Sequence, residues 1–486
     1  MANHNHAAAI RVLLLHTNDV HSRLEQAARI ATYIESERLA IGDERLLLLD
    51  IGDHMDRMRM ETEGSDGLVN IRLMNDAGYD AVTLGNNEGL TCTDGMLERA
   101  YGREARFSVL CANMVRTGSG SRPAWMQPDK IIERGGLRFG LIGVTAAFAE
   151  FYAMLGWEMI DPIAAVAQRA AALRPHADVI IVLSHLGLQL DKRMAEEVEG
   201  IDLILGGHTH HLLEEPLVMN GTSICAAGKF GEYVGRVEIG WDERSKLPTV
   251  RATCVPMAAF PEHEEASAAI GSFRASAASR LSRIVADLSE PLPLSAERES
   301  PLANMLAAGI RRHTDAEIGI VNAGQLLAGL PKGAVTEAAL HALCPSPINP
   351  CRMKLAGSLI RQALEESLLQ EWVSKAIRGY GFRGLVLGTL AVDGLDIRYA
   401  PEAPAYRKLR SVTVNGIPLE DGRDYVVGTI DMFTFGAGYE SISQGSDIRY
   451  YLPEFIRDVL AGELQRPDRD QAIADACMNR WHTTAE

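Results

Sequence analysis

The sequence lacks three features that would each have pointed to a particular class of protein. It has no excess of basic residues: 64 acidic and 48 basic residues give a formal net charge of -16, which leaves no electrostatic footprint for nucleic acid or an anionic membrane surface. It has no apolar run of membrane-spanning length, since candidates such as 179–183 are strand-sized. Its seven cysteines are odd in number and show no paired spacing. These absences favour a soluble acidic protein.

The start of the chain also lacks a secretory signal. Met1-Ala-Asn-His-Asn-His6 leads almost directly into a strand-like segment, with no basic region, long apolar stretch or cleavage site before it. The cysteines fit reduced, buried thiols. Cys344 and Cys351 flank a proline-rich loop, but a disulfide between them is the less favoured interpretation. We therefore expect a cytoplasmic protein.

Length and pattern indicate an α/β protein with more than one domain. The chain has 486 residues, of which 47% are hydrophobic, so it is too long for one ordinary core and apolar enough for several. Helical patterns, such as 24–38 and 163–173, alternate with short strand-like runs that are apolar almost throughout, which indicates sheet covered on both faces. The predicted strands are 12–15, 46–50, 81–84, 107–111, 137–144, 179–183 and 201–205, followed by a hairpin of 234–239 and 250–256.

Composition changes near Pro261 and divides the chain. The segment 262–289, rich in Ala, Ser, Glu and Arg, predicts one long helix, which ends at Glu290-Pro-Leu-Pro293. A second set of helices (302–313, 357–370, 453–462) and strands (318–321, 389–392, 425–429) follows. The domains we expect are 1–257, a linker helix in 258–293, and a smaller α/β domain in 294–486.

Residues able to bind metal follow five of the predicted strands. In open α/β sheets ligands bind beyond the carboxyl ends of strands, so five such loops would converge on one site. Each loop carries imidazole, carboxylate or amide oxygen, all of which are metal ligands. The loops are His16-Thr-Asn-Asp19-Val-His21, Asp50-Ile-Gly-Asp53-His54, Gly85-Asn86-Asn87-Glu88, Ser184-His185 and Gly206-Gly-His208-Thr-His210-His211.

The spacing within these loops favours a pair of metal ions. In extended chain, side chains two residues apart point to the same side, so Asp19 and His21 would face one ion together, as would His208 and His210. Phosphoryl transfer gains most from two cations about 3.5–4 Å apart, and such a pair needs a shared carboxylate. Asp53 is the natural bridge.

Each segment taken alone has a simpler interpretation. A single His after an apolar strand is more often packed or capping than a metal ligand, and Asp19 or Asp53 would serve equally as a helix N-cap. Five such segments in succession, all at strand ends, are hard to explain as caps. The metal interpretation therefore outweighs the structural one.

These motifs resemble those of the calcineurin-like metallophosphoesterases, and more closely the branch of 5'-nucleotidases and UDP-sugar hydrolases. The second half agrees with the substrate domain of that branch, although more loosely. The segments that carry this second resemblance are Glu299-Ser-Pro-Leu-Ala-Asn304, Asn322-Ala-Gly324, Pro345-Ser-Pro-Ile-Asn349, the helix from Gly357 to Glu365, and Phe435-Gly-Ala-Gly-Tyr439.

The resemblance implies a fold and a set of ligands. The fold is a four-layered α/β/β/α domain, a linker helix and a smaller α/β domain that closes over the substrate. One ion would be held by Asp19, His21, Asp53 and His210. The other would be held by Asp53, Asn86, His185 and His208.

The third motif departs from the family pattern. Relatives usually carry Gly-Asn-His-Asp/Glu, whose His assists the reacting phosphate, whereas this chain has Asn87 at that place. An amide hydrogen-bonds but transfers no proton near neutral pH. We nevertheless consider Asn87 a catalytic candidate that would orient phosphate oxygens. A second candidate is His54, directly after Asp53, which would replace the missing imidazole; packing is an equally good interpretation, and His211 is a weaker candidate.

The second domain departs at two further places. Leu327 stands where relatives have an Arg that binds phosphate, and Ala437 where they have an Asp near the nucleobase. Candidates to compensate are Arg352, Arg361 and Arg383. The predicted substrate-binding residues are Asn322, Gly324, Phe433, Phe435 and Tyr439; the three aromatic ones would stack on a flat ring, or would simply belong to the core.

Taken together, these features predict a hydrolase that cleaves a phosphoester or pyrophosphate bond in a nucleotide-like small molecule. Two divalent metal ions would activate the attacking hydroxide, and the ligands suit Mn, Zn, Fe or Co. Neither nucleic acid nor a membrane is an expected partner. Two alternatives stay open: a non-catalytic relative that binds nucleotide or metal, and a phosphodiesterase acting on cyclic or sugar-linked diphosphates.

Overall fold

The computed structural model describes residues 10–245 and 247–484, so the segment Met1–His6 lies outside the described residues. The chain divides into two compact units, Met1–Ala277 and Ala278–Glu486. Within the described residues, no helix combines the length and the apolar character needed to cross a membrane.

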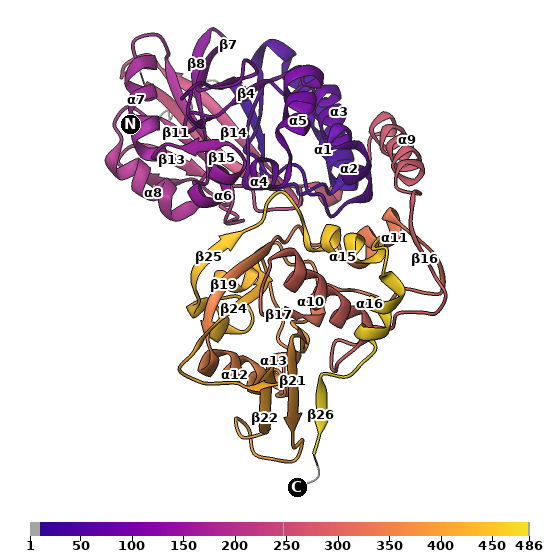
Figure 1. Ribbon diagram of the computed structural model, residues 1–486. Coiled ribbons are helices and arrows are strands. Elements are labelled where there is room, and N and C mark those ends of the chain that lie inside the picture. Colours follow the sequence, from indigo (N-terminus) through magenta and orange to yellow (C-terminus); the bar gives the residue numbers. More distant parts are fainter. Residues whose placement is uncertain (1–9, 246, 485–486) are drawn as a thin grey trace. The chain divides into compact units, whose positions relative to one another are not determined.

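Unit 1 is built on two mixed sheets (Figure 1). The first contains, in spatial order, β15 (Leu247–Pro256), β14 (Tyr233–Asp242), β1 (Ile10–Thr17), β2 (Leu46–Asp50), β3 (Ala81–Thr83), β4 (Ser108–Leu110) and β6 (Met126–Gln127). The second contains β12 (Leu217–Met219), β13 (Thr222–Cys225), β11 (Leu203–Gly206), β10 (Val179–His185), β8 (Leu137–Thr145) and β7 (Asp129–Arg134).

Alternating side chains stack these sheets face to face and cover each with helices. On β1, Val12 and Leu14 pack against the second sheet, whereas Leu13 and Leu15 belong to the core beneath the helices. The helices α1 (Leu24–Ile41) and α3 (Leu68–Ala77) cover the first sheet, and α7 (Pro162–Leu173) and α8 (Leu188–Glu197) cover the second (Figure 1). The four-layered α/β/β/α arrangement is thereby confirmed.

Shorter elements complete unit 1. They are α2 (Met60–Ser65), α4 (Asn86–Thr91), α5 (Asp94–Leu97), a π-helical segment (Glu98–Glu104), α6 (Ala149–Met154), and the small antiparallel pair of β5 (Met114–Arg116) and β9 (Trp157–Met159).

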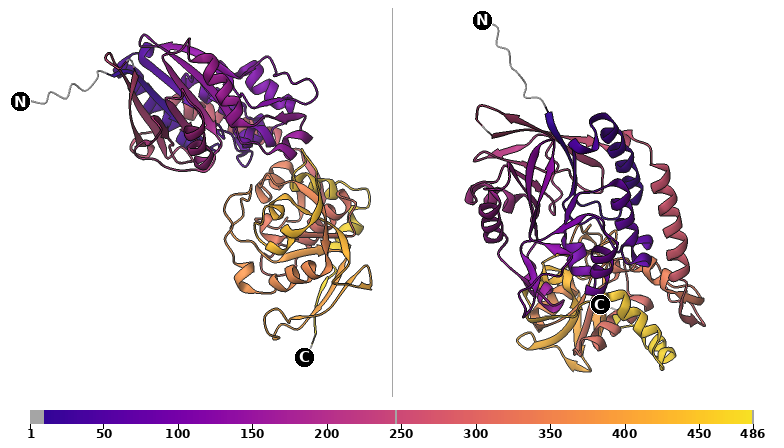
Figure 2. Two further views of the ribbon diagram at one scale, coloured as in Figure 1. Left: turned by 90° about the vertical axis from the view of Figure 1, so that its left-hand side faces the viewer. Right: turned by 90° about the horizontal axis from the view of Figure 1, so that it is seen from above.

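The linker helix is shorter than the sequence predicts. Helix α9 spans Glu264–Arg280 and packs Ala266 and Ile270 beside α1 and α3 (Figure 2). The predicted helix over 262–289 is wrong beyond Arg280, because Ile284–Leu288 forms strand β16 and pairs antiparallel with β18 (Gly333–Thr336). β-branched Ile284 and Val285 favour such a strand, but only the distant partner reveals it.

Unit 2 is a smaller α/β domain. Its main sheet has the order β20 (Leu390–Asp393), β17 (Ile318–Asn322), β24 (Asp424–Ile430), β19 (Pro350–Ala356) and β25 (Ser446–Tyr450), and a second sheet has the order β23 (Ile417–Pro418), β22 (Leu409–Val414), β21 (Leu395–Tyr399) and β26 (Trp481–Thr483). The helices are α10 (Pro301–His313), α11 (Glu337–Leu343), α12 (Gly357–Glu366), α13 (Gln370–Val373), α14 (Asp431–Thr434), α15 (Ile456–Leu464) and α16 (Arg469–Ala476).

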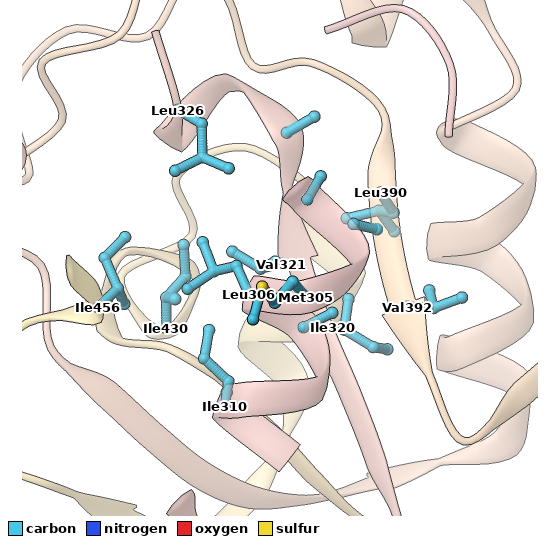
Figure 3. Packing of buried hydrophobic residues seen from close by; sticks show 14 of the residues in the cluster. Met305, Leu306, Ile310, Ile320, Val321, Leu326, Leu390, Val392, Ile430 and Ile456 are labelled. Carbon is cyan, nitrogen blue, oxygen red and sulfur yellow. The ribbon is translucent and has the colours of Figure 1, made fainter. Parts of the chain in front are cut away.

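Helix α10 supplies the centre of the unit 2 core. Met305, Leu306 and Ile310 from this helix are buried against strand residues such as Ile320 and Val392 (Figure 3). The strands predicted at 318–321, 389–392 and 425–429 are present within one residue at each end. Strands β18, β19, β21, β22, β23, β25 and β26 have no counterpart among the predicted elements.

Candidate metal centre

The two sheets bring all five predicted loops to one edge of unit 1. Strands β1, β2 and β3 are parallel neighbours in the first sheet, and β10 and β11 are parallel neighbours in the second. Parallel strands end at a common edge, and the sheets are stacked, so the loops that follow these strands meet. The convergence predicted from the sequence is therefore present.

The loops reach the site in left-handed turns. The prediction that Asp19 and His21, and likewise His208 and His210, lie in extended chain is therefore wrong. The φ angles are positive at Asp19 (51°), His21 (48°), Asp53 (52°), His208 (71°) and His210 (58°). Asp and His adopt this region more readily than most residues. Backbone hydrogen bonds join the first two loops, since the amides of Asp19 and His21 donate to the carbonyls of Gly52 and Asp53 at 3.0 and 2.8 Å.

The ligand atoms form two overlapping groups that share Asp19: one contains Asp19, His21 and His210, and the other contains Asp19, Asp53 and His185. In the first, Nε2 of His210 lies 3.4 Å from Oδ1 of Asp19 and 3.2 Å from Nε2 of His21. Ring nitrogens that face each other and a carboxylate at this distance are what a cation would satisfy.

Asp53 belongs to the second group, and one of its oxygens also faces a ligand of the first group. Its Oδ1 is 3.4 Å from Nε2 of His185, and its Oδ2 is 3.9 Å from Nε2 of His21. The two oxygens of one carboxylate therefore face imidazoles from opposite sheets.

The remaining two predicted ligands adjoin His185. The side-chain oxygen of Asn86 is 3.3 Å from Nε2 of His185, and the ring centre of His208 is 5.2 Å from that of His185. The backbone amide of His208 also donates to both oxygens of Asp19, at 3.0 and 3.2 Å. All seven predicted ligands thus lie in one cluster.

The cluster is buried, so the charges within it shift one another's pKa strongly. Burial alone would raise the pKa of Asp53, but His185 and His21 outweigh it and hold the pKa of Asp53 below its ordinary value. Burial likewise opposes the charge on His185, yet Asp53 and Asp19 raise the pKa of His185 to about 10. Burial, assisted by the charge on His185, lowers the pKa of His208 to about 4. Buried carboxylates that need nearby positive charge suit a cation site.

Hydrogen bonds from the surrounding loops hold the ligands in place. The carboxylate of Glu88 accepts from the backbone amides of Asp53 (3.0 Å), Gly85 (2.9 Å) and Met55 (2.8 Å). Nδ1 of His185 is 2.7 Å from the carbonyl oxygen of Ile51 and donates to it, which leaves Nε2 free to bind a metal. The residues present therefore fit a pair of divalent ions.

The three polar candidates for catalysis occupy different positions. Nδ2 of Asn87 is 2.9 Å from Nδ1 of His21. His54 is 4% exposed; its Nδ1 is 3.2 Å from Nδ2 of Asn70, and burial lowers its pKa to about 4. His211 is exposed beside the hydroxyl of Thr209, at 2.8 Å. The structure therefore favours packing for His54.

A cationic group at the rim of the cluster was not predicted from the sequence. The ring of Phe230 lies 5.7 Å from that of His21, and Arg23 and Lys229 each place their charge 4.6 Å from its centre. Within the described residues, no ion pair involves either cation. A basic residue two positions after His21 was the available signal.

The substrate residues predicted in unit 2 are mostly buried. Phe433 and Tyr439 have no exposed surface, and the Tyr439 hydroxyl donates to the carbonyl of Gly388 at 2.7 Å. Asn322 is also fully buried and donates to the carbonyl of Leu387 at 2.6 Å. Gly324 allows close backbone contact, since a Cβ there would lie 2.0 Å from the carbonyl oxygen of Val386.

Phe435 differs, because it is 43% exposed and stacks on Tyr380, with ring centres 6.2 Å apart and planes inclined by 23°.

Of the arginines considered as replacements for the phosphate Arg, Arg361 donates to Asp421 at 2.9 Å and Arg352 to the carbonyl of Thr314 at 3.4 Å. Arg383 is half-buried beside Phe382.

The buried carboxyl of Asp431 should make unit 2 sensitive to pH. Its Oδ2 accepts from the amide of Asn349 at 3.1 Å, while its Oδ1 has no partner among the described residues. Burial raises its pKa from 3.8 to about 7. Between these values the folded chain keeps a proton that the unfolded chain has lost, so stability falls as pH rises through this window and is constant above it.

We expect Asp431→Asn to remove this loss. Urea unfolding of both proteins at pH 5 and pH 8 measures this loss. From pH 5 to pH 8 the free energy of unfolding of the variant should rise relative to that of the wild type by up to a few kcal/mol, since each pKa unit corresponds to about 1.4 kcal/mol. Parallel changes in both proteins between the two pH values would contradict the assignment.

Comparison with known proteins gives the chain its family. Residues 12–212 match the calcineurin-like phosphoesterase family, and residues 284–442 match the 5'-nucleotidase C-terminal domain. An uncharacterized metallophosphoesterase of Bacillus subtilis, YunD, is 34% identical over 93% of this chain and 99% of its own length. The 5'-nucleotidase of Mus musculus is 26% identical over 74% of this chain and 72% of its own.

A solved structure agrees in fold. The NAD nucleotidase of Haemophilus influenzae superposes with a TM-score of 0.70 over 98% of this chain and 99% of that one, at 17% identity. The cluster of Asp and His ligands lies within the segment that matches the phosphoesterase family. The chain therefore belongs to the 5'-nucleotidase family of calcineurin-like metallophosphoesterases and is a metal-binding hydrolase.

Proposed function

We propose that this protein hydrolyses a phosphoester or pyrophosphate bond in a nucleotide-like small molecule with the help of two divalent ions. Asp19, His21, Asp53 and His210 would hold one ion; the other would be held by Asp53, Asn86, His185 and His208. The observation that carries the proposal is the position of Asp53, whose two oxygens face His185 and His21. A bridging carboxylate is what a two-metal site requires.

The chain's own residues prepare the site for such a reaction. Two metal ions, when bound, would supply an activated hydroxide and neutralise charge on the phosphoryl group. Asp53 would help to hold both ions, and Glu88 ties the second and third loops together by accepting hydrogen bonds from the amides of Asp53, Met55 and Gly85. Arg23 and Lys229 add positive charge at the rim, where a phosphate or diphosphate group needs it.

A nucleotide-like substrate is supported by two observations. The mouse relative is named a 5'-nucleotidase, and the match to the C-terminal domain of that family covers residues 284–442. Of the predicted aromatic residues, Phe435 is the exposed one, and with Tyr380 it provides a flat surface on which a planar ring would stack. Phe433 and Tyr439 would support this surface from the core.

Asn87 favours one variant of this function. No imidazole stands at this position, so a leaving group that departs without a proton is easier to expel than a simple alkoxide. Pyrophosphate bonds and activated diesters have such leaving groups. A phosphodiesterase acting on cyclic or sugar-linked diphosphates is therefore our second candidate function.

Removal and return of metal tests the function. Protein treated with a chelator should lose turnover of nucleoside mono- and diphosphates, cyclic nucleotides and an aryl phosphate, and Mn²⁺, Zn²⁺, Fe²⁺ or Co²⁺ should restore it. Comparison of substrates side by side separates monoester from diester chemistry. If the protein binds two ions per chain and turns over none of these compounds, a non-catalytic binding role replaces the proposal.

A further inference from the structure

The side chain of Asn87 lies behind a proposed metal ligand. Its Nδ2 is 2.9 Å from Nδ1 of His21 and 3.3 Å from the carbonyl oxygen of Met55. Its backbone amide donates to Oδ1 of Asp53 at 2.7 Å. One residue of the third loop therefore contacts ligands from the first and the second loops.

The two ring nitrogens of His21 have different surroundings. Nε2 faces the cluster, at 3.2 Å from Nε2 of His210 and 3.8 Å from Oδ1 of Asp19. Nδ1 faces Asn87. An imidazole that binds metal through Nε2 carries its hydrogen on Nδ1 and needs an acceptor there, which orients the ring.

The structure places the donor Nδ2 of Asn87 against Nδ1 of His21, and a half-turn of the amide, at the cost of its contact with the Met55 carbonyl, would make Oδ1 of Asn87 the nearest acceptor for this hydrogen. The carboxylate of Asp56 is farther away, with Oδ2 at 3.9 Å from Nδ1, and its Oδ1 already accepts from the amide of Met58 at 2.9 Å. An amide can also serve either form of the ring: its NH₂ donates when Nδ1 is bare, and a half-turn presents its oxygen when Nδ1 carries hydrogen. A carboxylate could only accept, and an apolar side chain could do neither.

We propose that Asn87 is a positioning residue that orients His21 as a ligand of the Asp19–His21–His210 group, rather than a group that contacts the reacting phosphate. This inference rests on the two-metal function proposed above. The residue that replaces the family's imidazole then has a task of its own, which is to hold a metal ligand.

Metal binding by the apoprotein tests this role without any measurement of turnover. Wild type, Asn87→Leu and Asn87→Asp are titrated with Mn²⁺ in a calorimeter. Loss of a partner behind a ligand typically weakens metal binding about 10–100-fold, so Asn87→Leu should weaken one of the two sites by that factor. Asn87→Asp keeps an acceptor for Nδ1 and should bind at least as tightly as wild type.

A double-mutant comparison assigns the effect to His21. In a His21→Ala background the ligand is gone, so Asn87→Leu should cause no further loss of Mn²⁺ affinity. Asn86→Leu is the matched neighbour: it should weaken binding further in that background, because its oxygen lies beside His185. Melting temperatures of the metal-free wild type and Asn87→Leu should coincide.

Each contrary result overturns the inference. Identical Mn²⁺ isotherms for wild type and Asn87→Leu would show that Asn87 does not serve a ligand, while the proposed function would stand. An equal loss in the His21→Ala background, or a lower melting temperature of metal-free Asn87→Leu, would show a general structural role instead. A wild type that binds none of Mn²⁺, Zn²⁺, Fe²⁺ and Co²⁺ would remove both the inference and the two-metal function.

Discussion

Replacing Asp53 with Asn is expected to lower turnover about a thousandfold or more and to reduce bound metal from two ions to one. The neutral amide keeps the shape of Asp53 and tolerates its φ of 52°, so the backbone should not change. It cannot bridge two cations, and a metal ion that stabilises charge in the transition state contributes several kcal/mol, where each 1.4 kcal/mol or so is a factor of ten in rate.

The measurements are kcat for the best substrate and metal content after gel filtration. Asp178→Asn is the matched control: Asp178 precedes β10 at the end opposite His185 and bonds to exposed Arg138, at 3.2 Å. It should leave both quantities unchanged. Full occupancy and full activity in Asp53→Asn would show that the cluster does not share a bridging carboxylate.

Gly85→Ala should disrupt the site even though it adds only one methyl group. A Cβ at Gly85 would lie 2.1 Å from Oδ1 and 2.2 Å from the backbone nitrogen of Asp53. Neither atom can retreat, because Oδ1 accepts from Asn87 and the nitrogen donates to Glu88. We expect the loop to shift, metal binding to fall sharply, and stability to drop by about 1–3 kcal/mol, as overpacking usually costs.

The matched control is Gly95→Ala. Gly95 lies in α5, and a Cβ there would meet nothing within 4 Å. Ala is the better helix former, so this change should be neutral or stabilise by up to about 1 kcal/mol. Urea unfolding and Mn²⁺ titration of both variants check the contrast. Equal behaviour of the two variants would mean that the close contact at Gly85 is not needed.

Much of the site could be predicted because its information is local. A strand that is apolar throughout ends where polar residues begin, as Val12–Leu15 does before Asp19, and parallel strands deliver such ends to one edge. Imidazole, carboxylate and amide oxygen are themselves metal ligands, so their presence in five such loops predicted a metal site. The period-two argument for Asp19 and His21 failed, because the loop turns left-handed where its amides bond to Gly52 and Asp53 of another loop.

Other features depend on partners far away in the chain. The sequence alone predicts helix for Ile284–Leu288, because β18, the strand that pairs with this segment, lies far along the chain. The exposure of Phe435 and the burial of Phe433 and Tyr439 cannot be separated by sequence pattern, since all three are aromatic residues of one short segment. In the sequence, Asn87 marks only the loss of the family's catalytic His; the structure shows that the Asn87 side chain contacts His21.

The sequence by itself therefore determined the chemistry of this protein: which residues can bind metal, which strands present them, and that no imidazole follows Asn86. Only the tertiary structure decided how these groups meet. Asp53 faces both His185 and His21 because two separate sheets stack, and Asn87 meets His21 because three loops cross. Ligand identity is a property of single side chains, whereas bridging and positioning are relations between residues that only packing brings together.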